Sequence, residues 1–195
     1  MSPRESPDAS LIEPAAGPGA AAAATPGDTG VGSRNLALSE EIIGLLIARG
    51  RTLAVAESLT GGMLAAALTA IPGSSAAFRG GVVCYATDLK AALLGVPPEL
   101  LDRHGAVHPA VAAAMAEAAC RRLTAAIGAA TTGVAGPDPA DGQPVGTVFI
   151  AVSGGAGAGT QVRSLALSGD RQQIRVATVT QVLDLLLGVL REDNI

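Results

Sequence analysis

The sequence has few aromatic side chains and no clustered positive charge. Only 2% of its 195 residues are aromatic and none is Trp, although 49% are apolar. One domain of ordinary size can therefore bury a core made mostly of aliphatic side chains. Thirteen basic residues stand against seventeen acidic ones, for a formal charge of −4, and no Lys/Arg-rich stretch occurs. Because nucleic-acid binding depends on clustered Lys and Arg, we expect no nucleic-acid partner.

Cysteines and other metal ligands are also scarce. Cys84 and Cys120 lack the paired spacing of a zinc site, and Cys84 stands in an apolar run typical of a buried thiol. His104 and His108 are four residues apart, but a glycine and a proline break the helix that would pair them, and no cluster supplies further ligands. We expect no metal and no other cofactor, with His104 holding a turn or lining a pocket rim.

The amino-terminal segment lacks large side chains. Residues 1–34 are mainly Ala, Gly, Pro and Ser, including five alanines at 20–24, a composition typical of a disordered tail. The first ten residues mix both charges and have no Leu-rich core, so they do not resemble a secretory signal, and we expect a cytoplasmic protein. Arg175, Gln181 and Asp184 interrupt the last long apolar segment, which argues against a membrane span.

Residues 35–195 are expected to form the folded domain. Apolar periodicity predicts helices after Ser39 and Thr87 as their caps, and over 63–70, 109–127 and 172–190; it predicts strands at 52–56, 80–85, 129–134, 145–152 and 160–167. A glycine-rich turn before the last strand predicts an antiparallel hairpin. This order predicts a single-domain three-layer α/β/α sandwich on a mixed sheet. The apolar content and the aliphatic last helix are compatible with a homo-oligomer.

One segment joins a predicted strand to a helix through a polar turn. Glu57, Ser58 and Thr60 follow the strand, and Gly61 and Gly62 precede the helix. This arrangement projects hydroxyl groups from the carboxyl end of a strand, where α/β sheets bind ligands, and directs the N–H groups of a helix start at the ligand. The pattern is typical of a nucleophile on a sharp turn, but a serine here is also a common helix cap. The spacing leaves both interpretations open.

Further candidates lie at other junctions. Tyr85 ends the second predicted strand, and Lys90 after it is either a solvated charge or a buried amine with a lowered pKa. The loop 133–138 is suited to cradling a phosphate with its N–H groups, although such loops are mostly turns. Arg171, at the start of the last helix, is suited to a phosphate or carboxylate clamp or to a surface salt bridge.

Seven motifs occur in series over about residues 37–190. They are Ala56-Glu57-Ser58-x-Thr60-Gly61-Gly62, Pro72-Gly73-Ser74-Ser75 with Phe78 and Gly80, Val83-x-Tyr85 with Lys90 and Leu94-Gly95-Val96, His104-Gly105-Ala106-Val107, Thr132-Gly133-x-Ala135-Gly136-Pro137-Asp138, Pro144-Val145-Gly146-Thr147-Val148, and Ser168-Gly169-Asp170-Arg171 with Ile174-Arg175. In this combination the chain resembles the CinA C-terminal domain family, the nicotinamide-nucleotide amidohydrolases. Many CinA proteins carry a preceding domain that residues 1–34 cannot encode, so we expect the standalone form.

The resemblance implies an activity and a mechanism. The activity is hydrolysis of the carboxamide of nicotinamide mononucleotide to nicotinate mononucleotide and ammonia, a step of pyridine nucleotide salvage. The mechanism is metal-free, with Ser58 as nucleophile, Lys90 as general base and Tyr85 orienting Lys90 or the substrate. Turn N–H groups from Thr60 to Gly62 would stabilise the oxyanion. Ser74 also matches a family position, so the nucleophile is either Ser58 or Ser74.

The resemblance also assigns residues to substrate binding. The phosphate would lie against the loop 133–138, or against Arg171 and Ser74. The full expected set is Glu57, Thr60, Gly61, Gly62, Ser74, Ser75, Thr132, Gly133, Gly136, Pro137, Asp138 and Arg171. In the family, Ser often stands at the position of His108. The alternative function is a nucleotide-binding module without catalysis, acting as a sensor or assembly partner.

Overall fold

The computed structural model describes residues 30–154 and 159–192, which form a five-stranded mixed sheet in the order β2-β1-β3-β4-β5. The strands are β1 (Leu53–Glu57), β2 (Phe78–Val83), β3 (Ile127–Gly133), β4 (Thr147–Ser153) and β5 (Thr160–Ala166). Strands β2, β1 and β3 are parallel, whereas β4 is antiparallel to both of its neighbours. The mixed sheet and the β4–β5 hairpin expected from the sequence are confirmed.

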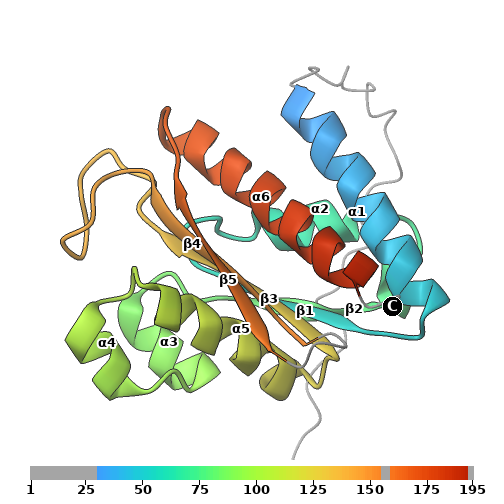
Figure 1. Ribbon diagram of the computed structural model, residues 1–195, viewed down its shortest axis with the longest axis horizontal. Helices are drawn as coiled ribbons and strands as arrows, with labels where there is room; N and C mark the ends of the chain where they lie inside the picture. Colours follow the sequence, from blue (N-terminus) through green and yellow to red (C-terminus); the bar gives the residue numbers. More distant parts are fainter. Residues whose placement is uncertain (1–29, 155–158, 193–195) are drawn as a thin grey trace, which may run out of the picture.

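Helices cover both faces of this sheet (Figure 1). Helices α1 (Gly30–Ala48), α2 (Met63–Thr69) and α6 (Arg171–Glu192) lie on one face, and α3 (Thr87–Leu94), α4 (Pro98–His104) and α5 (Pro109–Leu123) lie on the other. A short 3-10 helix, η2 (Ser74–Ala76), precedes β2. The predicted three-layer α/β/α sandwich is therefore confirmed.

The sheet separates two aliphatic cores, because successive side chains of a strand point to opposite faces. Leu53 and Val55 of β1 pack with α1, α2 and α6, whereas Ala54 and Ala56 pack with α5 on the other face. The small side chains on the α5 face allow a close approach of helix and sheet. A Cβ on Gly128 of β3 would collide with the carbonyl oxygen of an α5 residue.

Helix α1 begins earlier than the sequence predicts. It starts at residue 30, so residues 30–34 are helical rather than part of a tail. Ser39 lies inside the helix, buried, and is not its cap. The physical reason is packing against α6, where the buried Asn35 accepts a hydrogen bond from Thr180 at 2.8 Å and Arg34 forms an exposed ion pair with Asp184 at 2.9 Å. The rest of the predicted tail, residues 1–29, lies outside the described residues.

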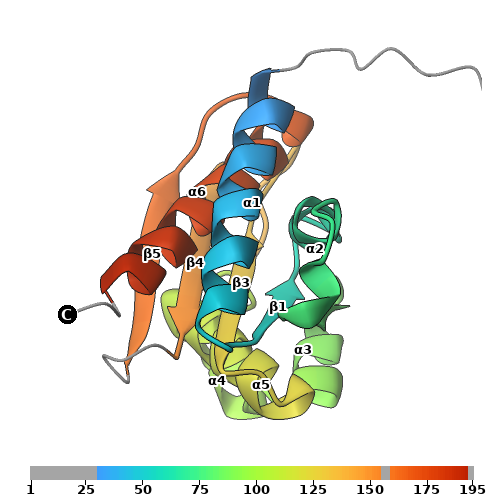
Figure 2. The ribbon, with the colours of Figure 1, turned by 90° about the vertical axis from the view of Figure 1, so that its right-hand side faces the viewer.

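Helix α6 is a core helix of the domain. It has 22 residues and an 18-residue stretch of mean hydropathy 1.4, the length and composition of a membrane span, yet 61% of that stretch is buried within the fold. Figure 2 shows it beside α1 over the same face of the sheet. Its first two turns reach the carboxyl ends of the parallel strands, where they contribute Arg171 and Arg175 to the contacts described next.

Candidate functional site

The carboxyl ends of β1, β2 and β3 meet at one edge of the sheet, and a cavity of about 170 Å³ lies there. Ser58 follows β1, whereas Tyr85 and Lys90 follow β2. The lining residues are Ser58, Leu59, Tyr85, Thr87, Lys90, Ala106, Val107, Thr132, Gly133, Ala135, Ala140, Asp141 and Arg171. The structure thus brings the three residues expected to be catalytic to one cavity, together with Thr132, Gly133 and Arg171.

A lysine amine contacts the serine hydroxyl inside this cavity. The Lys90 Nζ donates to Ser58 Oγ at 3.2 Å and to the carbonyl oxygen of Cys84 at 3.0 Å. Lys90 is only 1% exposed, and no described carboxylate forms an ion pair with it. Burial lowers the pKa of Lys90 below its usual value, an effect that the nearby Cys84 and Asp141 partly oppose. A lysine in this state can lose its proton and then accept one from a neighbouring hydroxyl.

The turn after Ser58 is held by a buried carboxylate. Glu57 is fully buried, and its two oxygens accept hydrogen bonds from the N–H groups of Gly62 (2.9 Å), Leu64 (3.1 Å) and Ala65 (2.8 Å). Glu57 therefore caps α2 and uses the donors at the start of that helix. The expectation that these N–H groups point at a ligand is wrong, because a side chain of the protein already occupies the anion position.

The prediction that the N–H groups from Thr60 to Gly62 stabilise an oxyanion is wrong for two of these groups. The N–H group of Gly61 bonds to the Ser58 carbonyl at 3.1 Å, and that of Gly62 bonds to Glu57. Neither donor is available to a substrate. For Leu59 and Thr60, no hydrogen bond of the N–H group is found in the part of the chain that the structure describes. These two amides therefore have no protein acceptor among the described residues; Leu59 lines the cavity, whereas Thr60 is fully buried.

Replacing Glu57 with glutamine is expected to destabilise the fold by about 1–3 kcal/mol. The new amide group would direct its own N–H bonds at a backbone N–H, which leaves a buried donor unsatisfied. Urea denaturation of the variant measures this loss, with Glu40→Gln, an exposed residue of α1, as the matched control. An unchanged denaturation midpoint for Glu57→Gln would show that Glu57 does not hold the turn.

Two threonines expected or found near the site make internal contacts. The hydroxyl of Thr60 is fully buried and lies 2.8 Å from that of Thr131 on β3. The hydroxyl of Thr132 lines the cavity but donates to the carbonyl of Ala106 at 2.7 Å. These hydroxyls join the turn and the loop before α5 to β3. Their contacts give them a structural role.

Tyr85 and Arg171 form the rim of the cavity. Arg171 donates from Nη2 to the Tyr85 hydroxyl at 2.7 Å and from Nη1 to the carbonyl of Gly136 at 2.7 Å. Tyr85 is 59% exposed, and its hydroxyl contacts Arg171 rather than Lys90. No described carboxylate neutralises Arg171. The rim therefore presents a guanidinium group that is suited to an anionic part of a ligand.

Some predicted binding residues lie away from the cavity. Ser74 and Ser75 begin η2, before β2, and so lie at the end of the parallel strands opposite to Ser58. Pro137 and Asp138 are exposed and do not line the cavity. Within this chain, the structure does not bring Ser74 next to Lys90.

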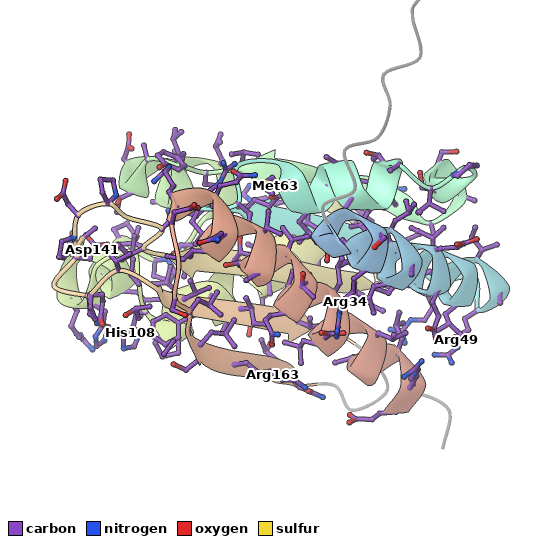
Figure 3. All side chains as sticks on the ribbon, turned by 90° about the horizontal axis from the view of Figure 1, so that it is seen from above. Arg34, Arg49, Met63, His108, Asp141 and Arg163 are labelled. Carbon is purple, nitrogen blue, oxygen red and sulfur yellow. The ribbon has the colours of Figure 1, made fainter. Side chains whose placement is uncertain are left out.

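Asp141 is a cavity residue that the sequence did not indicate. Its Oδ2 accepts a hydrogen bond from the N–H group of Ala106 at 2.7 Å, which ties the loop after β3 to the loop before α5. Figure 3 shows Asp141 and His108 at one end of the molecule, with Arg49 at the other. An acidic residue in a Gly/Pro-rich loop is usually a solvated turn residue, so nothing in the pattern distinguished Asp141.

His104 and His108 stack on each other, although they lie on either side of a helix break. Their ring centroids are 4.1 Å apart, and the interplanar angle is 16°. The Nδ1 of His108 accepts from the N–H group of Ala110 at 3.2 Å, so His108 caps α5. Burial, and secondarily the charge of His104, lowers the pKa of His108. No group of three metal-ligating side chains occurs within residues 30–154 and 159–192.

We expect His108→Ser to flatten the dependence of stability on pH. Because the folded pKa is below the unfolded value of about 6.5, the unfolded chain binds more protons in this range. His108 therefore supports the fold above pH 6.5 and loses this effect as the pH falls through its folded pKa. Melting temperatures between pH 5 and 8 test this, since the wild type should lose more stability than the variant on acidification. Melting temperatures that change equally with pH in the wild type and in His108→Ser would contradict this expectation.

The fold and site define a three-layer α/β/α domain with a buried amine–hydroxyl pair at the carboxyl ends of its parallel strands. The family model for the CinA C-terminal domain matches residues 35–190. A CinA-like protein of Frankia casuarinae is 52% identical over 159 residues, which are 82% of this chain and 36% of that protein. Another, from Parasynechococcus marenigrum, is 47% identical over 156 residues, 80% of this chain and 37% of that protein.

Solved structures agree with these relatives. The competence/damage inducible protein CihA of Agrobacterium tumefaciens is 36% identical with a TM-score of 0.76, over 80% of this chain and 95% of that one. A CinA superfamily protein of Klebsiella pneumoniae is 33% identical with a TM-score of 0.77, over 81% and 98%. The chain belongs to the CinA C-terminal domain family, and it spans little more than a third of the length of the curated relatives named above.

Proposed function

We propose that this protein is a nicotinamide-nucleotide amidase, which hydrolyses the carboxamide of nicotinamide mononucleotide to a carboxylate and ammonia in the cytoplasm. The observation that carries the proposal is the 3.2 Å contact between Ser58 Oγ and the buried Lys90 Nζ. A serine hydroxyl becomes nucleophilic when a neighbouring base accepts its proton, and a lysine acts as that base only when its pKa is lowered. The contact with Ser58 and the burial of Lys90 support both conditions.

The cavity suits a small reacting group at the end of a larger anionic molecule. Its volume of about 170 Å³ is below the ~300 Å³ at which sites for complete drug-sized ligands begin. The carboxamide ring would enter the cavity, while the rest of the nucleotide would lie outside it. Arg171 at the rim is the charged group placed to meet the phosphate. The exposed Asp138 and Pro137 are not part of this contact.

The reaction would proceed through an acyl-enzyme. Ser58 Oγ attacks the amide carbon while its proton passes to Lys90, and the amide oxygen becomes an oxyanion held by the N–H groups of Leu59 and Thr60. Lys90 then gives the proton to the leaving nitrogen, the C–N bond breaks and ammonia departs. A water molecule gives a proton to Lys90 and attacks the acyl carbon. The acyl bond to Ser58 breaks, and Ser58 recovers a proton from Lys90.

Ammonia release from nicotinamide mononucleotide by the purified protein tests the proposal. Nicotinamide, nicotinamide riboside and glutamine serve as comparison amides, because they share the amide but lack the phosphate. We expect turnover of the mononucleotide and much slower turnover of the others. Binding of the mononucleotide without ammonia release would favour the nucleotide-binding module instead.

The rate is expected to rise with pH. If the base is neutral Lys90, kcat/KM should increase through a single inflection that lies below the ordinary lysine pKa of about 10.4, because burial lowers the pKa of this amine. Initial rates of ammonia release across pH 6–10 measure the inflection. A rate that falls with rising pH over this range would exclude Lys90 as the base.

A further inference from the structure

Arg175, on the second turn of α6, contacts the backbone that follows Ser58. Its Nε donates to the carbonyl of Leu59 at 2.9 Å, and its Nη2 donates to the carbonyl of Thr60 at 3.0 Å. Its Nη1 donates to the side chain of Gln172 at 3.2 Å. Arg175 is half-buried and does not line the cavity, so it acts on the site only through the turn.

One of the two contacts constrains a peptide group that carries an available donor; the other holds the peptide group of the Gly61 N–H, which already bonds to the Ser58 carbonyl. The carbonyl of Leu59 belongs to the same planar peptide group as the N–H of Thr60, and in a trans peptide the two point in opposite directions. A hydrogen bond from a guanidinium to that carbonyl therefore fixes the direction of the Thr60 N–H. Hydrogen bonds from charged donors are stronger than those between neutral groups. The guanidinium of Arg175 therefore holds this peptide group more firmly than a neutral donor would.

The packing around the turn leaves little freedom for another arrangement. Gly61 has a φ of +59°, and a Cβ added to it would lie 3.2 Å from Arg175 Nη2. On the opposite side, β3 holds the turn through the Ser58 N–H, which donates to the Thr131 carbonyl at 3.1 Å. The turn is thus held between β3 and α6, and Arg175 supplies the α6 contacts.

We infer that Arg175 is a positioning residue for the proposed hydrolysis: it holds the Leu59–Thr60 peptide group so that the Thr60 N–H stabilises the oxyanion formed at Ser58. The inference rests on the proposed function. Because the oxyanion exists only after Ser58 attacks, Arg175 contributes to the transition state and not to substrate binding. Loss of Arg175 should therefore lower kcat and leave KM almost unchanged.

The test compares Arg175→Ala and Arg175→Lys with Arg191→Ala. Arg191 lies on the same helix and pairs with Glu41 of α1 at 2.7 Å, remote from the turn. We expect Arg175→Ala to lower kcat about 100-fold, the size of effect seen when one oxyanion donor is lost, with KM within about twofold of the wild type. Arg175→Lys keeps one charged donor and should retain part of the wild-type rate. Adding free guanidinium to Arg175→Ala should also restore part of the rate. Arg191→Ala should keep the wild-type rate.

A second readout separates this inference from the proposed substrate. A fluorophosphonate probe phosphonylates an activated serine: the Ser58 oxygen bonds to phosphorus, fluoride leaves, and the serine proton passes to Lys90. The developing charge on the phosphoryl oxygen needs the same N–H donors. If the wild type releases no ammonia but is labelled at Ser58, the proposed function fails, and slower labelling of Arg175→Ala still supports the positioning role.

Three results would overturn the inference. They are equal labelling rates in the wild type and in a folded Arg175→Ala, an unchanged kcat in that variant, or a rise in KM as the main effect. Absence of any labelling of the wild type would count against both proposals. Thermal unfolding establishes whether each variant is folded, and if Arg175→Ala does not fold, Arg175→Lys carries the comparison, with a lower kcat at unchanged KM as the expected result.

Discussion

Replacing Ser58 with alanine is expected to lower ammonia release from nicotinamide mononucleotide by at least about 10³-fold, because a nucleophile and its base act as a unit. Ser58 is 8% exposed and the variant removes only one oxygen atom, so the fold should remain intact. The acyl-enzyme cannot form on alanine. Mass spectrometry of the protein during turnover should find the acyl adduct in the wild type and not in the variant.

Ser164→Ala is the matched control for this experiment, since Ser164 is exposed on β5, away from the cavity. Its rate should equal that of the wild type. Ser74→Ala decides between the two serines that match family positions. Retained activity in Ser58→Ala together with lost activity in Ser74→Ala would make Ser74 the nucleophile and contradict the assignment made from the Lys90 contact.

Replacing Lys90 with methionine is expected to abolish activity, again by about 10³-fold or more, without lowering stability. Methionine has nearly the shape of the lysine side chain and carries no charge. In the wild type, burial lowers the Lys90 pKa, so below the unfolded value of about 10.4 the unfolded chain binds more protons than the folded one. This linkage destabilises the wild type at neutral pH, and the methionine variant is free of it.

The dependence of protein stability on pH tests this expectation. As the pH rises toward about 10.4, the wild type should regain stability relative to Lys90→Met, so the advantage of the variant should shrink. Denaturation midpoints at pH 7 and pH 9.5 measure this difference. Lys90 is the sole lysine of the chain, so chemical modification of amines reports on this position and the chain terminus alone. A fully active Lys90→Met would contradict the proposed base.

The fold was predictable because its signals are local. The strand at Leu53–Glu57 is an apolar run, α2 begins after two glycines, and α6 has an aliphatic stripe. Helix starts were less predictable: Ser39 has the sequence context of a cap, yet the helix begins before it, where its residues pack against α6 and Arg34 meets Asp184. That contact joins residues 150 positions apart, which no local pattern encodes.

The site residues also divide into those that the sequence predicted and those that it did not. Ser58 and Lys90 each follow a strand, so their meeting could be expected once the strands were taken as parallel neighbours. Glu57 was predicted to bind substrate, yet it caps α2, because its carboxylate is buried among three backbone N–H groups. Sequence does not show which way a carboxylate beside a turn will point. Nor did the sequence indicate a role for Arg175, since its contacts with the turn after Ser58 are to backbone carbonyls.

The packing of the two aliphatic cores on opposite faces of the sheet affects how the protein loses activity under heat or pressure. Ser58 adjoins Leu59, which belongs to the core shared by α1, α2 and α6, whereas Lys90 lies on α3, whose Leu94 belongs to the core with α5. The 3.2 Å contact therefore joins the end of a central strand to a helix that covers one face of the sheet. A slight shift of α3 along the sheet would break this contact, so heat or pressure should inactivate the protein before it unfolds.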